Sequence, residues 1–228
     1  MALAGKGAIV IRFDRPPETL DAFYDWMIGE HMPERLSIPG FLRGRRFRKA
    51  SGADRFLTIY EVEGMHVLRG PHYLERLNNP TPLTRRTAPQ STNLSRGDTA
   101  VELSLGVSQG GAMCTLGFAP EAGREAQLRA HITTAMHATM AMRGVLGAHL
   151  CVTDEAASRT EVEERKGRHI AVPAWIGLVE GVSLPLVERA CDEHLSWEAL
   201  RAHGAADAFE RESWVHEMTL PHLPERYR

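Results

Sequence analysis

The sequence predicts an α+β protein built from one ferredoxin-like unit followed by a second. Two observations carry this prediction. Short β-branched runs alternate with longer helical patterns in the split-βαβ order β-α-β-β-α-β, and the same order then recurs in the second half. Gln109-Gly110-Gly111 is the natural junction between the two. We therefore expect two tandem modules, over residues 1–108 and 109–228.

The first half contains four strand patterns and two helix patterns. The strands are expected at residues 7–14, 41–49, 55–63 and 91–105, and the helices at residues 19–31 and 65–78. Thr19 is expected to cap the first helix, because its hydroxyl can accept from the free amides of the first turn. Pro33 is expected to bend or end that helix, and Gly70-Pro71 to interrupt the second. Residues 83–90 are expected to form a polar connector.

The second half repeats this order with little identity. Its strands are expected at residues 112–118, 145–153, 170–180 and 212–220, and its helices at residues 124–142 and 184–203. The charged segment 154–168 is typical of an extended, mobile loop. Phe13 is matched with Phe118, Gly40 with Gly144, and residues 60–64 with residues 177–181. These matches favour an internal duplication.

Composition excludes several classes of function. The net charge is −2, which gives no general attraction to nucleic acid or anionic membranes. No run approaches the roughly 20 apolar residues that span a bilayer, and no signal-peptide cleavage region precedes the first strand. Cys114, Cys151 and Cys191 lie far apart and indicate neither a disulfide framework nor a metal site. We expect a cytoplasmic protein with no nucleic-acid or membrane partner.

His31 is the first candidate for chemistry. It falls at heptad-like spacing on one helix face with Leu20, Tyr24 and Met27, so it is expected to point at the sheet. A buried imidazole with a pKa near 6–7 can act as a general acid or base. The alternative is a core histidine that is hydrogen-bonded to a backbone carbonyl.

A family resemblance is carried by Trp26, Glu30-His31-Met32-Pro33, Pro39-Gly40-Phe41 and Arg45-Arg46-Phe47. Together they resemble the EthD-like branch of the dimeric α/β-barrel superfamily. Residues 73–82 are similar to a stretch in uncharacterised bacterial members that have two such modules. The resemblance implies two four-stranded sheets that face each other as a barrel, which this chain could build alone. It also implies a ligand cleft between each sheet and its helices.

The resemblance and the residues together suggest a site in the first half. His31 is the expected general acid or base, Tyr60 or Tyr24 would orient a substrate oxygen, and Arg43 or Arg46 would stabilise negative charge. The remaining candidates for substrate contact are Trp26, His72 and Tyr73. Core packing is the alternative for the aromatic residues, and a solvated sheet edge for the arginines.

The second half differs at the corresponding position. When Gly40 is aligned with Gly144, Ala135 takes the place of His31, and only a gap would bring His137 there. We therefore expect the first half to hold the working pocket and the second half to be mainly structural.

The expected function is that of a cofactor-free enzyme. It would act by acid/base chemistry on a small, largely apolar carbonyl, enol or phenol compound, as an isomerase, lyase, cyclase or monooxygenase. One alternative is a non-catalytic small-molecule binding protein of the same fold, and another is a haem-dependent enzyme, because the superfamily includes both. No HExxH or facial-triad spacing predicts a metal. Further dimerisation stays open, and fold alone does not decide between these functions.

Overall fold

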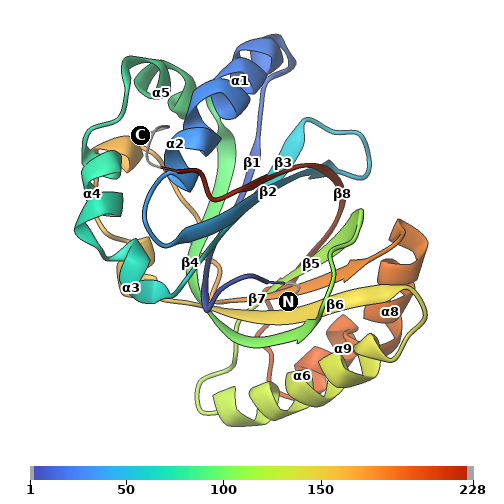
Figure 1. The fold of residues 1–228 in the computed structure, drawn as a ribbon. Coiled ribbons are helices and arrows are strands. Elements are labelled where there is room, and N and C mark those ends of the chain that lie inside the picture. Colours follow the sequence, from blue (N-terminus) through green and yellow to red (C-terminus); the bar gives the residue numbers. More distant parts are fainter. Residues whose placement is uncertain (1–2, 225–228) are drawn as a thin grey trace.

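Eight antiparallel strands close into one barrel within a single chain (Figure 1). The computed structural model describes residues 3–224. The strands are β1 (Gly7–Asp14), β2 (Phe41–Lys49), β3 (Arg55–Val62), β4 (Thr92–Gly106), β5 (Ala112–Phe118), β6 (Val145–Thr153), β7 (Trp175–Gly181) and β8 (Glu210–Pro221). They follow one another around the barrel in the order β1-β3-β2-β8-β5-β7-β6-β4.

Two four-stranded sheets form this barrel. The first sheet is β4-β1-β3-β2 and the second is β8-β5-β7-β6. They join where β2 pairs with β8 and where β4 pairs with β6, so each sheet closes the open edges of the other. The predicted α+β class and intramolecular α/β barrel are confirmed.

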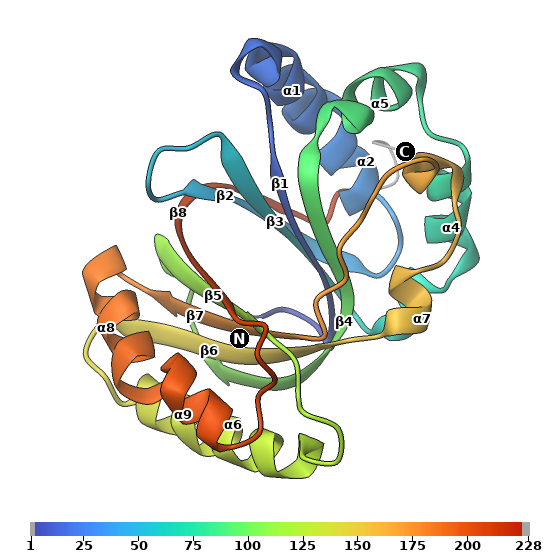
Figure 2. The same cartoon turned by 180° about the vertical axis from the view of Figure 1, so that it is seen from behind.

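Helices cover the outer faces of both sheets (Figures 1 and 2). They are α1 (Leu20–Trp26), the π-helical turn η2 (Met27–His31), α2 (Met32–Leu36), α3 (Met65–Leu68), α4 (Pro71–Asn78), α5 (Pro82–Thr87), α6 (Glu125–Met140), α7 (Glu155–Ser158), α8 (Leu184–His194) and α9 (Trp197–Ala202), with 3-10 turns η1 (Pro17–Thr19), η3 (Ala88–Gln90) and η4 (Glu163–Arg165). Among the helices of residues 3–224, none is both long enough and apolar enough to cross a bilayer.

The first helix begins and ends differently from the prediction. Thr19 does not cap it with its side chain: its hydroxyl donates to the carbonyl of Pro16 at 2.8 Å, within a 3-10 turn. Pro33 does not end it either. The π-helical turn η2 widens the helix just before this proline, and Pro33 then lies in the first turn of α2, where its missing N–H is not needed.

Two further element predictions are wrong in detail. The polar connector expected over residues 83–90 is mostly helix α5, whose first turn is capped by the Thr81 hydroxyl, which accepts from the amide of Thr84 at 3.0 Å. The single helix expected over residues 184–203 is two helices, because Ser196 starts a new one by accepting from the amide of Ala199 at 3.3 Å.

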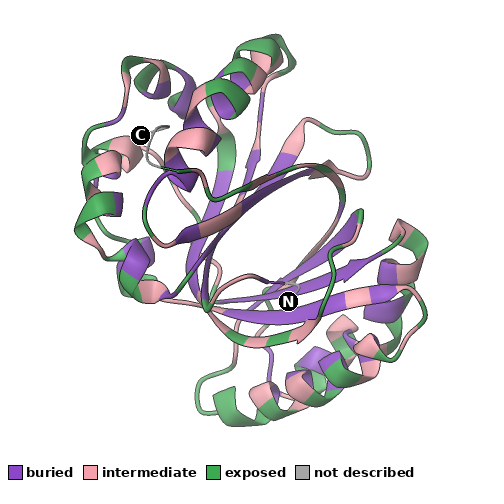
Figure 3. Ribbon diagram, viewed as in Figure 1, coloured by how far each residue is buried: buried purple, intermediate pink, exposed green. Residues whose placement is uncertain are grey.

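Apolar packing is divided among three layers, and the buried residues follow the inner faces of helices and both faces of the sheets (Figure 3). One layer lies between the first sheet and its helices, and a second between the second sheet and its helices. The third fills the barrel interior, where Trp214, Phe47 and Ile59 are fully buried.

The two sheets are related by matching registers. Phe13 is opposite Phe56 in the first sheet, and Phe118 is opposite Trp175 in the second, which makes Glu61 the counterpart of Glu180. The sequence match of residues 60–64 with residues 177–181 is therefore shifted by two positions. Gly40 and Gly144 occupy equivalent helix-to-strand turns with φ of +85° and +83°. The duplication and the boundary at residue 108 stay predictions.

Candidate active site

A cavity of about 60 Å³ lies between the first sheet and the helix that runs from α1 through η2 to α2. Its apolar wall includes Ile9, Phe13, Trp26, Met27, Leu94 and Ile170. Its polar wall is made of side chains from η2, α2, β3, α4, β4 and the segment that connects β6 to β7. This is the sheet-to-helix cleft in which the resemblance places a ligand.

His31 enters this cavity from the last residue of the π-helical turn. π-helical turns often mark functional sites, because the inserted residue re-aims the side chains around it. The side chain of His31 is 7% exposed and lies against the ring of Trp26, with 4.3 Å between the ring centroids and the two ring planes tilted by 36°. Trp26 is held in turn by its Nε1, which donates to Thr84 Oγ1 at 2.9 Å. Within the described residues, Nδ1 of His31 has no hydrogen-bond partner.

The surroundings of His31 keep it neutral. Burial, and then the positive charge of Arg35, lower the pKa of His31 to about 3, and the carboxylate of Glu164 only partly opposes them. The expectation of a pKa near 6–7 is therefore wrong. A side chain with this pKa is an unprotonated imidazole at neutral pH, able to accept a proton or a hydrogen bond at Nδ1.

Tyr60 and Thr58 face the cavity from β3. The hydroxyl of each is buried and, among residues 3–224, has no hydrogen-bond partner. Burial raises the pKa of Tyr60 above its ordinary value, so the phenol keeps its proton. The phenol of Tyr73 also lines the cavity and accepts from Arg96 at 2.6 Å.

Four of the predicted site residues do not line this cavity. Arg43 instead donates to Glu61 at 3.0 and 2.6 Å. Arg46 lies against the Tyr24 ring, with its guanidinium 4.6 Å from the ring centroid, and it donates to Glu217 at 2.9 Å. The hydroxyl of Tyr24 donates to the same carboxylate at 2.9 Å, and His72 is exposed on α4. The structure thus brings together His31, Tyr60, Trp26 and Tyr73.

The sequence reasoning missed the roof of the cavity, which comes from the second half of the chain. This roof is the segment between β6 and β7. It is not an extended loop, because it forms α7 and η4 and runs beside β4 to the helices of the first sheet (Figure 2). Ala171 pairs with β4, accepting from the amide of Arg96 at 2.9 Å and donating to the carbonyl of Leu94 at 2.9 Å. The charged residues between 163 and 168 could have indicated a contribution to the site, but a loop exposed to solvent has the same composition.

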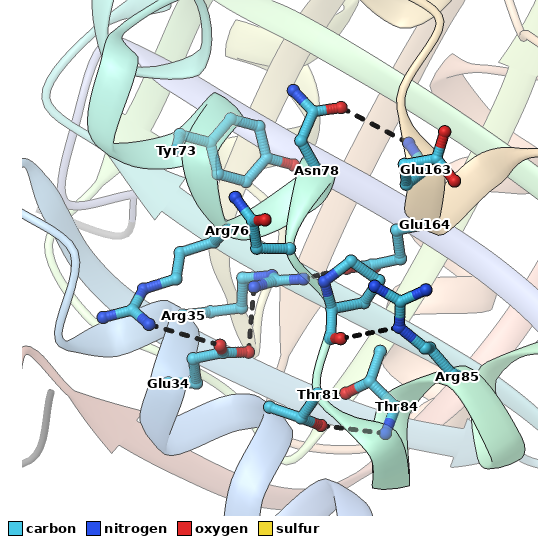
Figure 4. A network of polar contacts seen from close by, with 12 residues as sticks. Glu34, Arg35, Tyr73, Arg76, Asn78, Thr81, Thr84, Arg85, Glu163 and Glu164 are labelled. Atoms are coloured by element: carbon cyan, nitrogen blue, oxygen red, sulfur yellow. Dashed lines mark hydrogen bonds and ion pairs between the residues drawn. The ribbon is translucent and has the colours of Figure 1, made fainter.

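Ion pairs hold this roof in place (Figure 4). Glu164 binds Arg35, whose guanidinium also binds Glu34 at 3.1 Å. The amide of Glu163 donates to the side chain of Asn78 on α4 at 3.4 Å. The roof therefore contributes both a carboxylate and guanidinium groups to a cavity whose floor is apolar.

The second sheet has no corresponding histidine. Ala135 and Met136 are buried on α6 against the second sheet, whereas His137 is exposed. Leu128, Ile132, Met136, Leu116 and Val179 pack together in that layer. The mainly structural role expected for the second half stays a prediction.

Comparisons with known proteins identify the fold. No protein-family model matches the sequence, and no curated protein matches it. Among solved structures, an anthrone oxidase-like protein matches with a TM-score of 0.67 and 11% identity over 99% of this chain and 97% of that one. A proposed monooxygenase from Fusobacterium nucleatum matches with a TM-score of 0.60 and 10% identity over 96% of both chains.

A haem-binding protein from Thermus thermophilus matches with a TM-score of 0.50 and 14% identity over 93% of this chain and 92% of that one. Identities this low establish the fold alone, and membership of the EthD-like branch stays a prediction. The chain thus has the ferredoxin-like fold of the dimeric α/β-barrel proteins, closed here within one polypeptide.

Proposed function

We propose that this protein is a cofactor-free enzyme that removes a proton from a small phenol, enol or carbonyl compound. One observation carries the proposal. Nδ1 of His31 and the hydroxyls of Tyr60 and Thr58 are buried, face one cavity and, within residues 3–224, have no partner. Buried polar groups are almost always hydrogen-bonded. A ligand that presents both a donor and an acceptor would satisfy this set.

The chemistry follows from the protonation states. His31 is neutral and accepts the hydrogen bond of the ligand O–H at Nδ1. As the proton of the O–H or activated C–H passes to Nδ1, the electron pair stays on the ligand as a phenolate or enolate, and this negative charge beside the ring raises the basicity of the imidazole above its value in the empty cavity. Tyr60 keeps its own proton and donates to the oxygen on which the charge develops. The imidazolium that forms is attracted by the carboxylate of Glu164.

Two structural neighbours support an oxygen-dependent form of this reaction, since one is an anthrone oxidase-like protein and the other a proposed monooxygenase. An enolate or phenolate can pass electrons directly to dioxygen. Isomerase, lyase and cyclase reactions begin with the same proton transfer. The test is to incubate the purified protein with a panel of phenols, anthrones and 1,3-dicarbonyl compounds, and to follow oxygen consumption and products.

The cavity does not fit the haem alternative. Its volume is about 60 Å³, so the walls would have to move much further for a haem macrocycle than for a single ring, which itself occupies a cavity of about 150 Å³. His31, the histidine that lines the cavity, lies tilted against the ring of Trp26, with 4.3 Å between the ring centroids. We therefore derive no step through haem. An absorption spectrum of the purified protein with a Soret band would contradict the proposed function directly.

Replacement of Tyr60 by phenylalanine tests the hydrogen-bond donor. The ring would keep its contact with Phe41, 6.1 Å between centroids, while the unpartnered hydroxyl is lost. We expect kcat/KM to fall about 10- to 100-fold, as for loss of one hydrogen bond to a developing charge. Thermal stability should be unchanged or slightly higher, because a buried unsatisfied group is removed.

Tyr24→Phe is the matched control for this variant. The Tyr24 hydroxyl bonds Glu217 at the surface, outside the cavity, so its loss should leave kcat/KM unchanged. Steady-state kinetics and thermal denaturation of both variants make the comparison. Full activity in Tyr60→Phe would show that this phenol does not touch the reacting oxygen.

A further inference from the structure

Within residues 3–224, the guanidinium groups that line the cavity outnumber the carboxylates that contact them. Four guanidinium groups line the cavity, those of Arg35, Arg96, Arg165 and Arg168. The carboxylates that contact these groups are Glu34, Glu164 and Asp98. His31 is neutral, so it does not offset the charge. A partly buried charge without a partner is costly, which favours an anion as part of the ligand.

The excess charge can be assigned to one side chain. Arg96 and Arg165 share the two oxygens of Asp98, at 2.7 and 3.3 Å, and Arg35 is held by two glutamates. Within the described part of the chain, the guanidinium of Arg168 makes no hydrogen bond or ion pair. Burial lowers the pKa of Arg168, the carboxylate of Glu164 nearby only partly opposes this, and the charges of Arg96 and Arg165 act in the same direction as burial.

We infer that the ligand of this cavity carries a carboxylate, which Arg168 binds at the roof while the reacting phenol, enol or carbonyl group lies against His31 and Tyr60. The inference deepens the proposed function, on which it rests for the location of the ligand. A guanidinium offers two parallel N–H donors that match a planar carboxylate. The apolar floor formed by Ile9 and Phe13 suits the hydrocarbon part of a small unsaturated or aromatic acid.

Arg168 is also placed on the route into the cavity. It lines the inner cavity and two open clefts on the outer side of the roof, of about 690 and 640 Å³. The inner cavity is less than half the size that a benzene ring needs, about 150 Å³. The cavity must therefore widen when a ligand enters, and Arg168 would contact an incoming anion from the outer clefts through to the bound position.

Two probes of the same shape test this inference. Salicylate and salicylamide both carry a phenol, but only the first carries a carboxylate. Calorimetric titration of the full-length protein should give a Kd for salicylate at least 10-fold lower than for salicylamide. In Arg168→Gln, the affinity for salicylate should fall about 10- to 100-fold, the value of a charged hydrogen bond, with salicylamide unchanged.

Arg189→Gln is the control, because this arginine pairs with Glu193 at 3.9 Å on α8, which covers the second sheet, and it lines neither the cavity nor the two outer clefts. It should bind both probes as the unmodified protein does. Failure of salicylate to bind, equal affinities for the two probes, or an unchanged salicylate affinity in Arg168→Gln would overturn the inference. The proposed function is tested separately. If the protein binds salicylate selectively but converts none of the phenols, the proposed enzyme activity is wrong and the anion site is supported. If it converts phenols but does not prefer the acid, the anion site is wrong and the enzyme activity is supported.

Discussion

Replacement of His31 by alanine is expected to lower kcat/KM for a phenol or enol substrate by about 100- to 10,000-fold, the usual contribution of a positioned general base. The reason is that the His31 imidazole is the neutral nitrogen base of the cavity, with its Nδ1 unpartnered within residues 3–224. Steady-state kinetics measure the loss. Added imidazole should restore part of the activity, because the deleted ring leaves a space of its own shape beside Trp26.

The pH dependence sharpens this expectation. Because the pKa of His31 is about 3 in the folded protein, the imidazole is already unprotonated at neutral pH. Its contribution to kcat/KM should therefore be flat through neutral pH and decline only in strong acid, as Nδ1 becomes protonated. A histidine with an ordinary pKa would instead give an inflection near 6.5. Such an inflection, lost in His31→Ala, would contradict the burial argument but not the role of the base.

His137→Ala supplies the control for His31→Ala. His137 is exposed on α6, and its loss should not change kcat/KM. If His31→Ala keeps full turnover, the proposed base is wrong. If the unmodified protein binds phenols but transforms none of them, the chain is a binding protein of the same fold, and His31→Ala should then change affinity alone.

Local periodicity predicted much of the fold and half of the site. His31 and Trp26 lie on the helix and Tyr60 on the strand that packs beneath it, so helical and strand periods place all three toward the same layer. Arg43 and Arg46 lie on opposite faces of β2, and each is engaged by a glutamate from a neighbouring strand. Glu61 lies opposite Arg43 within the β2–β3 hairpin, but the approach of Glu217 to Arg46 depends on the pairing of β2 with β8 in the closed barrel, which no local pattern determines.

Local sequence patterns could not predict the roof of the cavity for a different reason. Glu164 and Arg168 lie more than a hundred residues from His31, in a charged segment whose composition also fits solvent. What brings them to the cavity is barrel closure, since β6 pairs with β4 and carries the following segment across to the first sheet. A site whose base comes from one half and whose charged groups come from both halves depends on the closed barrel.

That closure depends on a buried charge network, and its removal has the second large expected effect. Glu180 on β7 is fully buried and accepts from Arg45 of β2 at 2.7 and 2.9 Å, while His149 Nε2 lies 3.5 Å away. Arg45 also contacts Glu61 at 2.8 Å. Glu180→Ala is expected to lower the free energy of unfolding by about 3–5 kcal/mol, because it leaves part of the Arg45 charge uncompensated in the interior.

Chemical denaturation at neutral pH measures this loss, and Glu193→Ala is the control. Glu193 pairs with Arg189 at 3.9 Å on the exposed face of α8, so its removal should cost less than about 1 kcal/mol. Equal, small effects of the two variants would show that the Arg45–Glu180 pair does not stabilise the barrel.

The pH dependence of stability gives the same network an independent test. Burial alone would raise the pKa of Glu180, but the neighbouring His149 and the charge of Arg45 overcome it and hold the pKa at about 2. A carboxyl whose pKa is lower in the folded than in the unfolded chain stabilises the fold at neutral pH, and this contribution disappears as the pH falls from about 4.5 toward 2. Glu180→Ala should therefore show a weaker dependence of unfolding free energy on pH over that range.

A double replacement distinguishes the cost of leaving one charge unpaired from the stabilisation that the ion pair itself provides. Arg45→Met combined with Glu180→Met removes both charges, so it should cost less than Glu180→Ala, because no charge is left unpaired between these two positions. Glu61 would lose one partner but keep its contacts with Arg43. A double variant as unstable as the single one would mean that the geometry of the ion pair itself, rather than compensation of charge, holds the first sheet to the second.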